Sequence, residues 1–249
     1  MAEREIIQCR DAAEVAHKAA EQWVVLAQRA IAASDRFTVS LSGGSTPKAL
    51  YSLLASPEYC ARIDWPHVHL FWGDERCVPP DHPESNYRMV REALLSKIEM
   101  PAENIHRMKG EIAPEEAAAS YEAELAQFFH LDAGALPHFD LVLLGLGEDG
   151  HTASLFPGTS APNETHKLVT TVYVERLNAH RLTITLPVIN AAAQVSFLVA
   201  GESKSAIVKA LLGRDSNPAQ YPAGQVRPAN GRLTWFITQD AGGGIVTSF

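Results

Sequence analysis

Two stretches of the chain are apolar at nearly every position and end in glycine. They are FDLVLLGLG at residues 139–147 and VSFLVAG at residues 195–201. A strand with one solvent-facing side alternates apolar and polar residues. Uninterrupted apolar runs of this length therefore indicate strands buried on both faces, as in parallel sheets that are covered by helices. This pattern constrains the fold of the chain more than any other feature of the sequence.

Segments with helical periodicity alternate with these and other strand candidates. Apolar residues recur at helical spacing from about residue 11 to residue 33, and Asp11 with Glu14 resembles a capping box. The other strand candidates are 37–41, 67–72, 168–174, 181–186 and 233–237, and the other helical patterns cover 86–95, 114–129 and 204–212. This order predicts a doubly wound α/β fold, with a mostly parallel sheet and helices on both faces. No segment resembles a domain linker, so we expect residues 1–249 to form a single domain.

The charge and the cysteines limit the kinds of partner and compartment. The net charge is −8, from 21 basic and 29 acidic side chains, which predicts binding to neither nucleic acid nor anionic membranes. A phosphorylated substrate would need its own local cluster of cations. The N-terminus lacks the apolar segment of a signal peptide, and no apolar run is long enough to span a bilayer. Three scattered cysteines, Cys9, Cys60 and Cys77, predict reduced thiols in a cytoplasmic protein.

In doubly wound sheets, ligands bind where the strands end. After the strand 37–41 comes SGGSTP, residues 42–47, which leads into a helix. Glycines let the backbone approach a ligand closely, and a helix start offers free N–H groups to an anion. Pro47 suits the first helical position, which makes Thr46 the expected N-cap. The segment is either a phosphate cradle or a plain tight turn.

The loop after the strand at 139–144 is GLGEDG, residues 145–150, and it formally matches G-x-G-x-x-G. Dinucleotide binding is disfavoured because Glu148 and Asp149 would face a pyrophosphate, and no acidic residue follows at the expected distance. His151 comes directly after the loop. Beside Asp149 it is either an oriented general base or a histidine without a catalytic role.

Other charged residues lie near expected strand ends. Asp74, Glu75 and Arg76 follow the strand 67–72, and we expect Asp74 or Glu75 to form an ion pair with Arg76. Arg181 opens a strand candidate and Lys204 opens a helix, so each is either a solvated charge or part of a site. His67 and His69 would share one strand face. Without a third ligand, this pair favours a structural role over metal binding.

Taken together, five motifs in this order closely resemble the 6-phosphogluconolactonase family, within the wider group that includes glucosamine-6-phosphate isomerase/deaminase. The motifs are LSGGSTPKALY, FWGDERCVPPDHPESNYRMV, FDLVLLGLGEDGHTASLFPG, RLTITLPVIN and GESKSAIV. The resemblance covers nearly the whole chain, to about Phe236. It implies a doubly wound, Rossmann-like α/β fold and hydrolysis of 6-phospho-D-glucono-1,5-lactone in the oxidative pentose phosphate pathway. It also implies that neither a metal nor an organic cofactor is needed.

The resemblance also assigns site residues. It implies that the substrate phosphate is held by Gly43, Gly44, Ser45, Arg181 and Lys204. His151 would be the catalytic base, with Asp149, Arg76 and Asp74 around the lactone. We expect one displacement in which neutral His151 activates water. A covalent nucleophile is not expected, because the sequence has no G-x-S-x-G motif.

Two alternatives remain. The deaminases are similar through the DGH segment, but they continue to Asn-Glu-Pro, whereas this chain has Phe156 at the position of that carboxylate. A phenyl ring cannot exchange protons, and Arg76 replaces an aromatic residue of the deaminases, so ring opening is disfavoured. The second alternative is a non-catalytic sugar-phosphate-binding domain of a transcription regulator. The first 35 residues show no basic helix-turn-helix module, which disfavours it.

Overall fold

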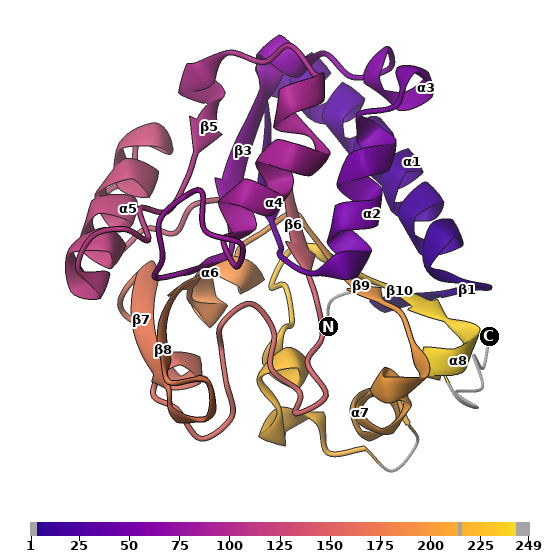
Figure 1. Ribbon diagram of the computed structural model, residues 1–249, viewed down its shortest axis with the longest axis vertical. Coiled ribbons are helices and arrows are strands. Elements are labelled where there is room, and N and C mark those ends of the chain that lie inside the picture. The colour runs from indigo at the N-terminus through magenta and orange to yellow at the C-terminus, as the bar shows by residue number, and fades with distance from the viewer. Residues whose placement is uncertain (1–3, 214–215, 243–249) are drawn as a thin grey trace.

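The computed structural model describes residues 4–213 and 216–242 (Figure 1). The strands are β1 Arg4–Cys9, β2 Phe37–Leu41, β3 Val68–Trp72, β4 Asp74–Arg76, β5 Ile105–His106, β6 Leu141–Leu144, β7 Val169–Val174, β8 Ala179–Ile184, β9 Gln194–Val199 and β10 Arg232–Thr238. The α-helices are α1 Ala12–Ser34, α2 Ser45–Leu54, α3 Pro57–Cys60, α4 Asn86–Ala93, α5 Pro114–Phe128, α6 Leu186–Asn190, α7 Ser205–Leu212 and α8 Gln239–Gly242.

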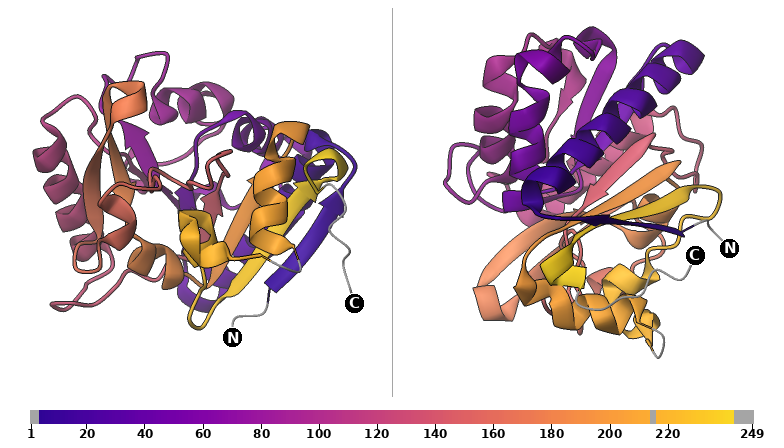
Figure 2. Two further views of the ribbon diagram at one scale, coloured as in Figure 1. Left: turned by 90° about the horizontal axis from the view of Figure 1, so that it is seen from below. Right: turned by 90° about the vertical axis from the view of Figure 1, so that its right-hand side faces the viewer.

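A seven-stranded parallel sheet forms the centre of the molecule, in the order β1-β10-β9-β6-β2-β3-β5. Every residue of β2, β6 and β9 is buried. The right-hand view of Figure 2 shows indigo and purple helices on one face of this sheet and orange and yellow helices on the other. The predicted doubly wound fold, mostly parallel and covered on both faces, is therefore confirmed.

The longest helix, α1, begins as its sequence predicts. The Asp11 side chain accepts a hydrogen bond from the Glu14 backbone N–H at 2.9 Å, which satisfies one of the unpaired donors of the first turn. The helix buries one face, including Trp23, against β2, β9 and β10. Buried apolar side chains from Cys9 to Ala241 form one hydrophobic cluster.

A second sheet is antiparallel and has the order β4-β8-β7. The strand candidates 168–174 and 181–186 belong to this sheet and not to the parallel one. A short turn, Glu175–Leu177 with Asn178, joins β7 to β8, and so short a connection can join only antiparallel strands. Asp74, Glu75 and Arg76, which follow β3, form β4 and pair with β8 in this second sheet.

Three local predictions are wrong. The helix α2 begins at Ser45, with Gly44 as its N-cap, and not after Thr46. Gly44 turns the chain into the helix with a φ of 105°, a value that favours glycine. His67 lies in a 3-10 turn, Trp65–His67, and so does not share a strand face with His69. The candidate strand 181–186 ends at Ile184, because α6 begins at Leu186.

Within the two described ranges, none of the helices combines the length and the apolar character that crossing a membrane requires.

Candidate active site

A cavity of about 430 Å³ opens where β2, β6 and β9 end. Its walls include the loop after β2, the loop after β6, residues of β4 and β8, and the segment after β9. The predicted site residues that line it are Gly43, Gly44, Ser45, Asp74, Arg76, His151, Arg181 and Lys204. Asp149 is not among the residues that line the cavity, but its Oδ1 contacts Nδ1 of His151. The fold therefore brings every residue of the predicted site to one place.

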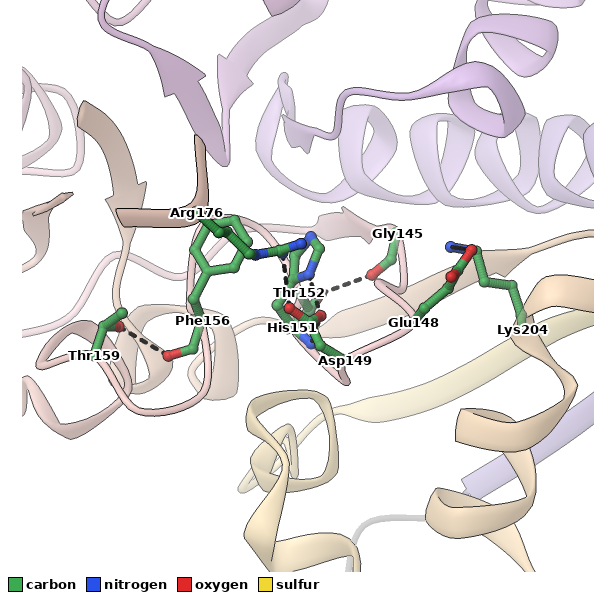
Figure 3. Close-up of polar contacts among 9 residues, drawn as sticks. All are labelled: Gly145, Glu148, Asp149, His151, Thr152, Phe156, Thr159, Arg176 and Lys204. Atoms are coloured by element: carbon green, nitrogen blue, oxygen red, sulfur yellow. Dashed lines mark hydrogen bonds and ion pairs between the residues drawn. The ribbon is translucent and has the colours of Figure 1, made fainter. Parts of the chain in front are cut away.

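One end of the cavity consists of glycine backbone and a helix start. The first N–H groups of α2, from Ser45 on, have no partner inside the helix and carry its positive dipole end. A Cβ on Gly43 would lie 2.0 Å from Oδ1 of the buried Asn86, so only glycine fits there. Lys204 Nζ lies 3.8 Å from Glu148 Oε1 (Figure 3). This end of the cavity suits an anion.

Arg76 and Arg181 are cross-strand neighbours on β4 and β8. Arg181 is only 9% exposed, and its burial, together with the positive charge of Arg76, lowers its pKa below the ordinary value. Among the described residues, neither guanidinium forms an ion pair with a carboxylate; Arg76 donates to the Glu84 carbonyl and Arg181 to the His180 carbonyl. Two adjacent guanidinium groups at the cavity wall give a strong local attraction for a negatively charged ligand.

The expected ion pair of Asp74 or Glu75 with Arg76 is not formed. The Glu75 carboxylate instead accepts hydrogen bonds from the backbone N–H groups of Arg76, Asn86 and Tyr87, each at 2.7 Å. Buried N–H donors at the start of α4 need an acceptor, and Glu75 supplies it. Asp74 accepts from Ser154 Oγ at 2.8 Å and from Asn86 Nδ2 at 3.2 Å.

The His151 ring is held on three sides. Nδ1 lies 2.5 Å from Asp149 Oδ1, and the Phe156 ring lies 4.3 Å away, centroid to centroid. On another side the ring touches the backbone of Gly147, where a Cβ would lie 1.9 Å from Nδ1. A carboxylate only accepts hydrogen bonds, so in the neutral ring Nδ1 carries the proton and Nε2 has the free lone pair.

Asp149 also forms an ion pair with Arg176, whose Nη2 lies 2.8 Å from Asp149 Oδ2. Burial raises the pKa of Asp149, but the hydrogen bonds from His151 and the charge of Arg176 outweigh burial, so the net pKa lies below its ordinary value. The carboxylate is thus ionised at neutral pH. Figure 3 shows His151, Asp149, Arg176 and Phe156 gathered in one cluster.

The cavity wall also contains polar residues that sequence analysis did not assign to the site, among them Asn86, Ser154 and Arg176. Asn86 and Ser154 stand inside the quoted motifs, but their contacts with Asp74 depend on the fold. Arg176 lies in the β7–β8 turn, outside every motif, and 27 residues separate it from Asp149. No local pattern could have indicated it.

Metal binding finds no support in this geometry. Over residues 4–213 and 216–242, no group of three or more His, Cys, Asp or Glu side chains is arranged to hold a metal ion. The chemistry available at the cavity is instead that of an oriented imidazole, several cations and free backbone N–H groups.

Together, the doubly wound sheet and the cavity at its carboxyl edge define an α/β protein whose cavity is suited to a small anionic molecule. The chain belongs to the glucosamine-6-phosphate isomerase/6-phosphogluconolactonase family, whose sequence pattern matches residues 10–235. The resemblance inferred from the five motifs is therefore confirmed.

Individual relatives agree with this assignment. The chain is 47% identical over 215 residues to a 6-phosphogluconolactonase of Synechocystis, covering 86% of this chain and 87% of the relative. It is 37% identical over 226 residues to a 6-phosphogluconolactonase of Haemophilus influenzae, and the match covers 90% of this chain and 92% of the relative. Its fold matches the solved structure of 6-phosphogluconolactonase from Trypanosoma brucei with a TM-score of 0.86 at 27% identity. The match covers 97% of this chain and 98% of the solved chain.

Proposed function

We propose that this chain is a 6-phosphogluconolactonase, an enzyme of the carboxylic ester hydrolase class. It hydrolyses 6-phospho-D-glucono-1,5-lactone to 6-phospho-D-gluconate, a step of the oxidative pentose phosphate pathway. A relative that is 47% identical to this chain carries this name. The observation that carries the proposal is the joining, in one cavity, of an oriented His151–Asp149 pair with a cationic, glycine-lined anion site.

The substrate phosphate binds at the glycine-lined end. Backbone N–H groups of Gly44 and Ser45 point at its oxygens, and Gly43 allows close approach. Lys204 and Arg181 supply the positive charge that a chain of net charge −8 needs to attract a phosphorylated ligand. On binding, phosphate replaces Glu148 as the partner of Lys204. The phosphate contacts are distant from the reacting carbonyl, so they contribute by positioning it.

The lactone carbonyl lies near His151. Nε2 takes a proton from a water molecule as the water oxygen attacks the carbonyl carbon. Arg76 stabilises the negative oxygen that develops, and the imidazolium then gives its proton to the ring oxygen as the ester bond breaks. General-base assistance contributes roughly 10²–10⁴-fold, and one oxyanion donor roughly 10²–10³-fold.

The function is tested by hydrolysis of freshly generated 6-phosphogluconolactone, corrected for its spontaneous opening. We expect the unchanged chain to hydrolyse it, and the His151→Ala variant to lose about 10²–10⁴-fold in kcat because water is no longer deprotonated. Circular dichroism checks that the variant is folded. Activity of His151→Ala within about threefold of the parent would remove the imidazole from the base role.

The phosphate assignment is tested separately with Arg181→Ala. Since Arg181 contacts the phosphate and not the carbonyl, this variant should raise KM at least about tenfold, the loss expected for one charge-assisted hydrogen bond, and change kcat less. Steady-state kinetics with the same lactone gives both constants. An unchanged KM would show that the phosphate does not bind beside Arg181.

The alternative of a glucosamine-6-phosphate deaminase is disfavoured by the ring beside His151. Phe156 packs 4.3 Å from the imidazole, where an acid–base carboxylate would have to stand, and it has no exchangeable proton. Release of ammonia from glucosamine 6-phosphate would favour the deaminase. Binding of the sugar phosphate without turnover would favour the non-catalytic domain.

Several expectations from the sequence form part of the proposal. The chain acts as one domain, which the single hydrophobic cluster supports. It works in the cytoplasm, in keeping with Cys9, Cys60 and Cys77 as free thiols. It needs no metal or organic cofactor, and it binds its small phosphorylated substrate but no nucleic acid and no membrane.

A further inference from the structure

Arg176 reaches the catalytic pair from the other sheet. It lies in the turn Glu175–Leu177 between β7 and β8, and its side chain is 56% exposed. Its guanidinium lies 5.2 Å over the Phe156 ring, and that ring packs against His151 at an interplanar angle of 32°. With the ion pair to Asp149, these contacts link four side chains, as Figure 3 shows.

The two oxygens of Asp149 have different partners. Oδ1 accepts from Nδ1 and from the backbone N–H of His151, and Oδ2 accepts from Arg176. A carboxylate held at one oxygen only can rotate about its last side-chain bond. Because Arg176 holds the second oxygen, the carboxylate plane is fixed, and with it the direction of the imidazole.

We propose that Arg176 is a positioning residue for lactone hydrolysis, which acts through Asp149 on the general base His151. This inference rests on the proposed function. The guanidinium fixes the orientation of Asp149 and places a positive charge near the imidazole. Removal of that charge should therefore be visible in the acid limb of the activity profile.

The other charges around the ring come from several elements. Glu148 and Asp149 belong to the loop after β6, and Asp149 alone contacts the ring. The charged side chains that line the rest of the cavity are Asp74 and Arg76 on β4, Arg181 on β8 and Lys204 before α7. Arg176 shares a carboxylate with the imidazole, so its removal should change the protonation of the ring more directly than removal of these groups.

The test uses Arg176→Met and Arg176→Lys. Methionine keeps an apolar contact with Phe156 but removes the charge and the hydrogen bond. A unit charge on a side chain that shares a partner with the ring changes a protonation equilibrium by roughly half a pH unit when it acts through a largely aqueous path. The acid limb of the kcat/KM profile should therefore move up by about 0.5 pH unit in Arg176→Met and return toward the parent in Arg176→Lys.

Arg62→Met is the matched control. Arg62 forms an ion pair with Glu21 at 2.7 Å and lies 5.0 Å over the Tyr59 ring, so it repeats both contacts of Arg176, but it is not among the residues that line the cavity. Its acid limb and kcat should match the parent. Loss of stability alone would affect both methionine variants and would leave the acid limb in place.

A failure of the proposed function would appear as a parent protein without lactonase activity. It can therefore be distinguished from a failure of the proposed role of Arg176, which is read from the pH profiles of the variants. If the parent is inactive, ¹⁵N NMR of the His151 ring reports the same effect without turnover: its titration should move upward in Arg176→Met and not in Arg62→Met. An acid limb or ring titration within 0.2 pH unit of the parent in Arg176→Met would overturn the proposal, whatever happens to kcat.

Discussion

The backbone of Gly147 restrains the imidazole of His151 by close contact with the ring. The ring of His151 lies so close that no side chain fits at position 147, and Phe156 covers another face of the ring. The glycine in this loop thus makes room for the His151 ring. Sequence analysis found His151 and Asp149 because they are neighbours in one motif, whereas Arg176 could not be found, since only folding brings it to Asp149.

Gly147→Ala should abolish the orientation of the base. The new Cβ would lie 1.9 Å from His151 Nδ1 and 2.7 Å from Asp149 Oδ1, so the ring must turn away. We expect lactonase activity to fall at least about 100-fold, the lower bound for loss of a general base, with little change in the far-ultraviolet circular dichroism spectrum. Gly242→Ala, whose Cβ would meet only Ile237 at 3.6 Å, is the control. Equal activity of the two variants would contradict the tight approach.

One buried side chain, Glu75, joins the strand β4 to the start of the helix α4. The Glu75 carboxylate, in a residue only 2% exposed, accepts three backbone N–H groups and the Ser85 hydroxyl. It anchors the start of α4 to the strand that carries Asp74 and Arg76. The sequence placed charges at this strand end but could not show that Glu75 would bind backbone rather than Arg76.

Glu75→Ala should therefore lower the free energy of unfolding by about 3 kcal/mol, because several buried donors lose their acceptor. Urea unfolding followed by fluorescence measures this. Glu92→Ala, which removes an exposed carboxylate of α4 paired with Arg88, should cost less than about 1 kcal/mol. If both variants lost the same amount, Glu75 would not anchor α4.

The elements that were predicted well are those with the strongest pattern. The buried strands β6 and β9 stand out in the sequence as uninterrupted apolar runs, and the long helix α1 stands out by the helical spacing of its apolar residues. The edge strands were missed. β1 is partly exposed and contains charged residues, and β5 has only two residues, so neither carries a periodic signal. The position of β7 and β8 in a separate sheet depends on pairing between distant segments.

A pair of histidines away from the cavity, His69 and His106, should make the free energy of unfolding of the whole molecule depend on pH. His69 Nδ1 lies 3.3 Å from His106 Nε2, and His106 Nδ1 lies 2.8 Å from Glu124 Oε1. Burial, together with the nearby His106, lowers the pKa of His69 to about 4. A histidine in the unfolded chain has a pKa of about 6.5. Between about pH 6.5 and pH 4, the unfolded chain therefore binds a proton at this position and the folded chain does not.

Stability should thus fall as the pH drops from about 6.5 toward 4. In His69→Phe, which keeps a ring beside Phe128, this loss should shrink by about 1 kcal/mol between pH 7 and pH 5, a figure reduced for the partial exposure of the site. Urea midpoints at the two pH values provide the measurement. The exposed His166, replaced by Gln, should leave the pH dependence unchanged. An equal loss in His69→Phe and the parent would contradict this origin of acid sensitivity.

The cavity takes its imidazole from the large parallel sheet and three of its arginines from the small antiparallel one. Under the proposed function, both sheets therefore contribute to ligand binding and to the support of the imidazole. An engineer who exchanged the β7–β8 hairpin between family members would thus replace Arg176 and Arg181 together, and would alter both the admission of the ligand and the support of the His151–Asp149 pair.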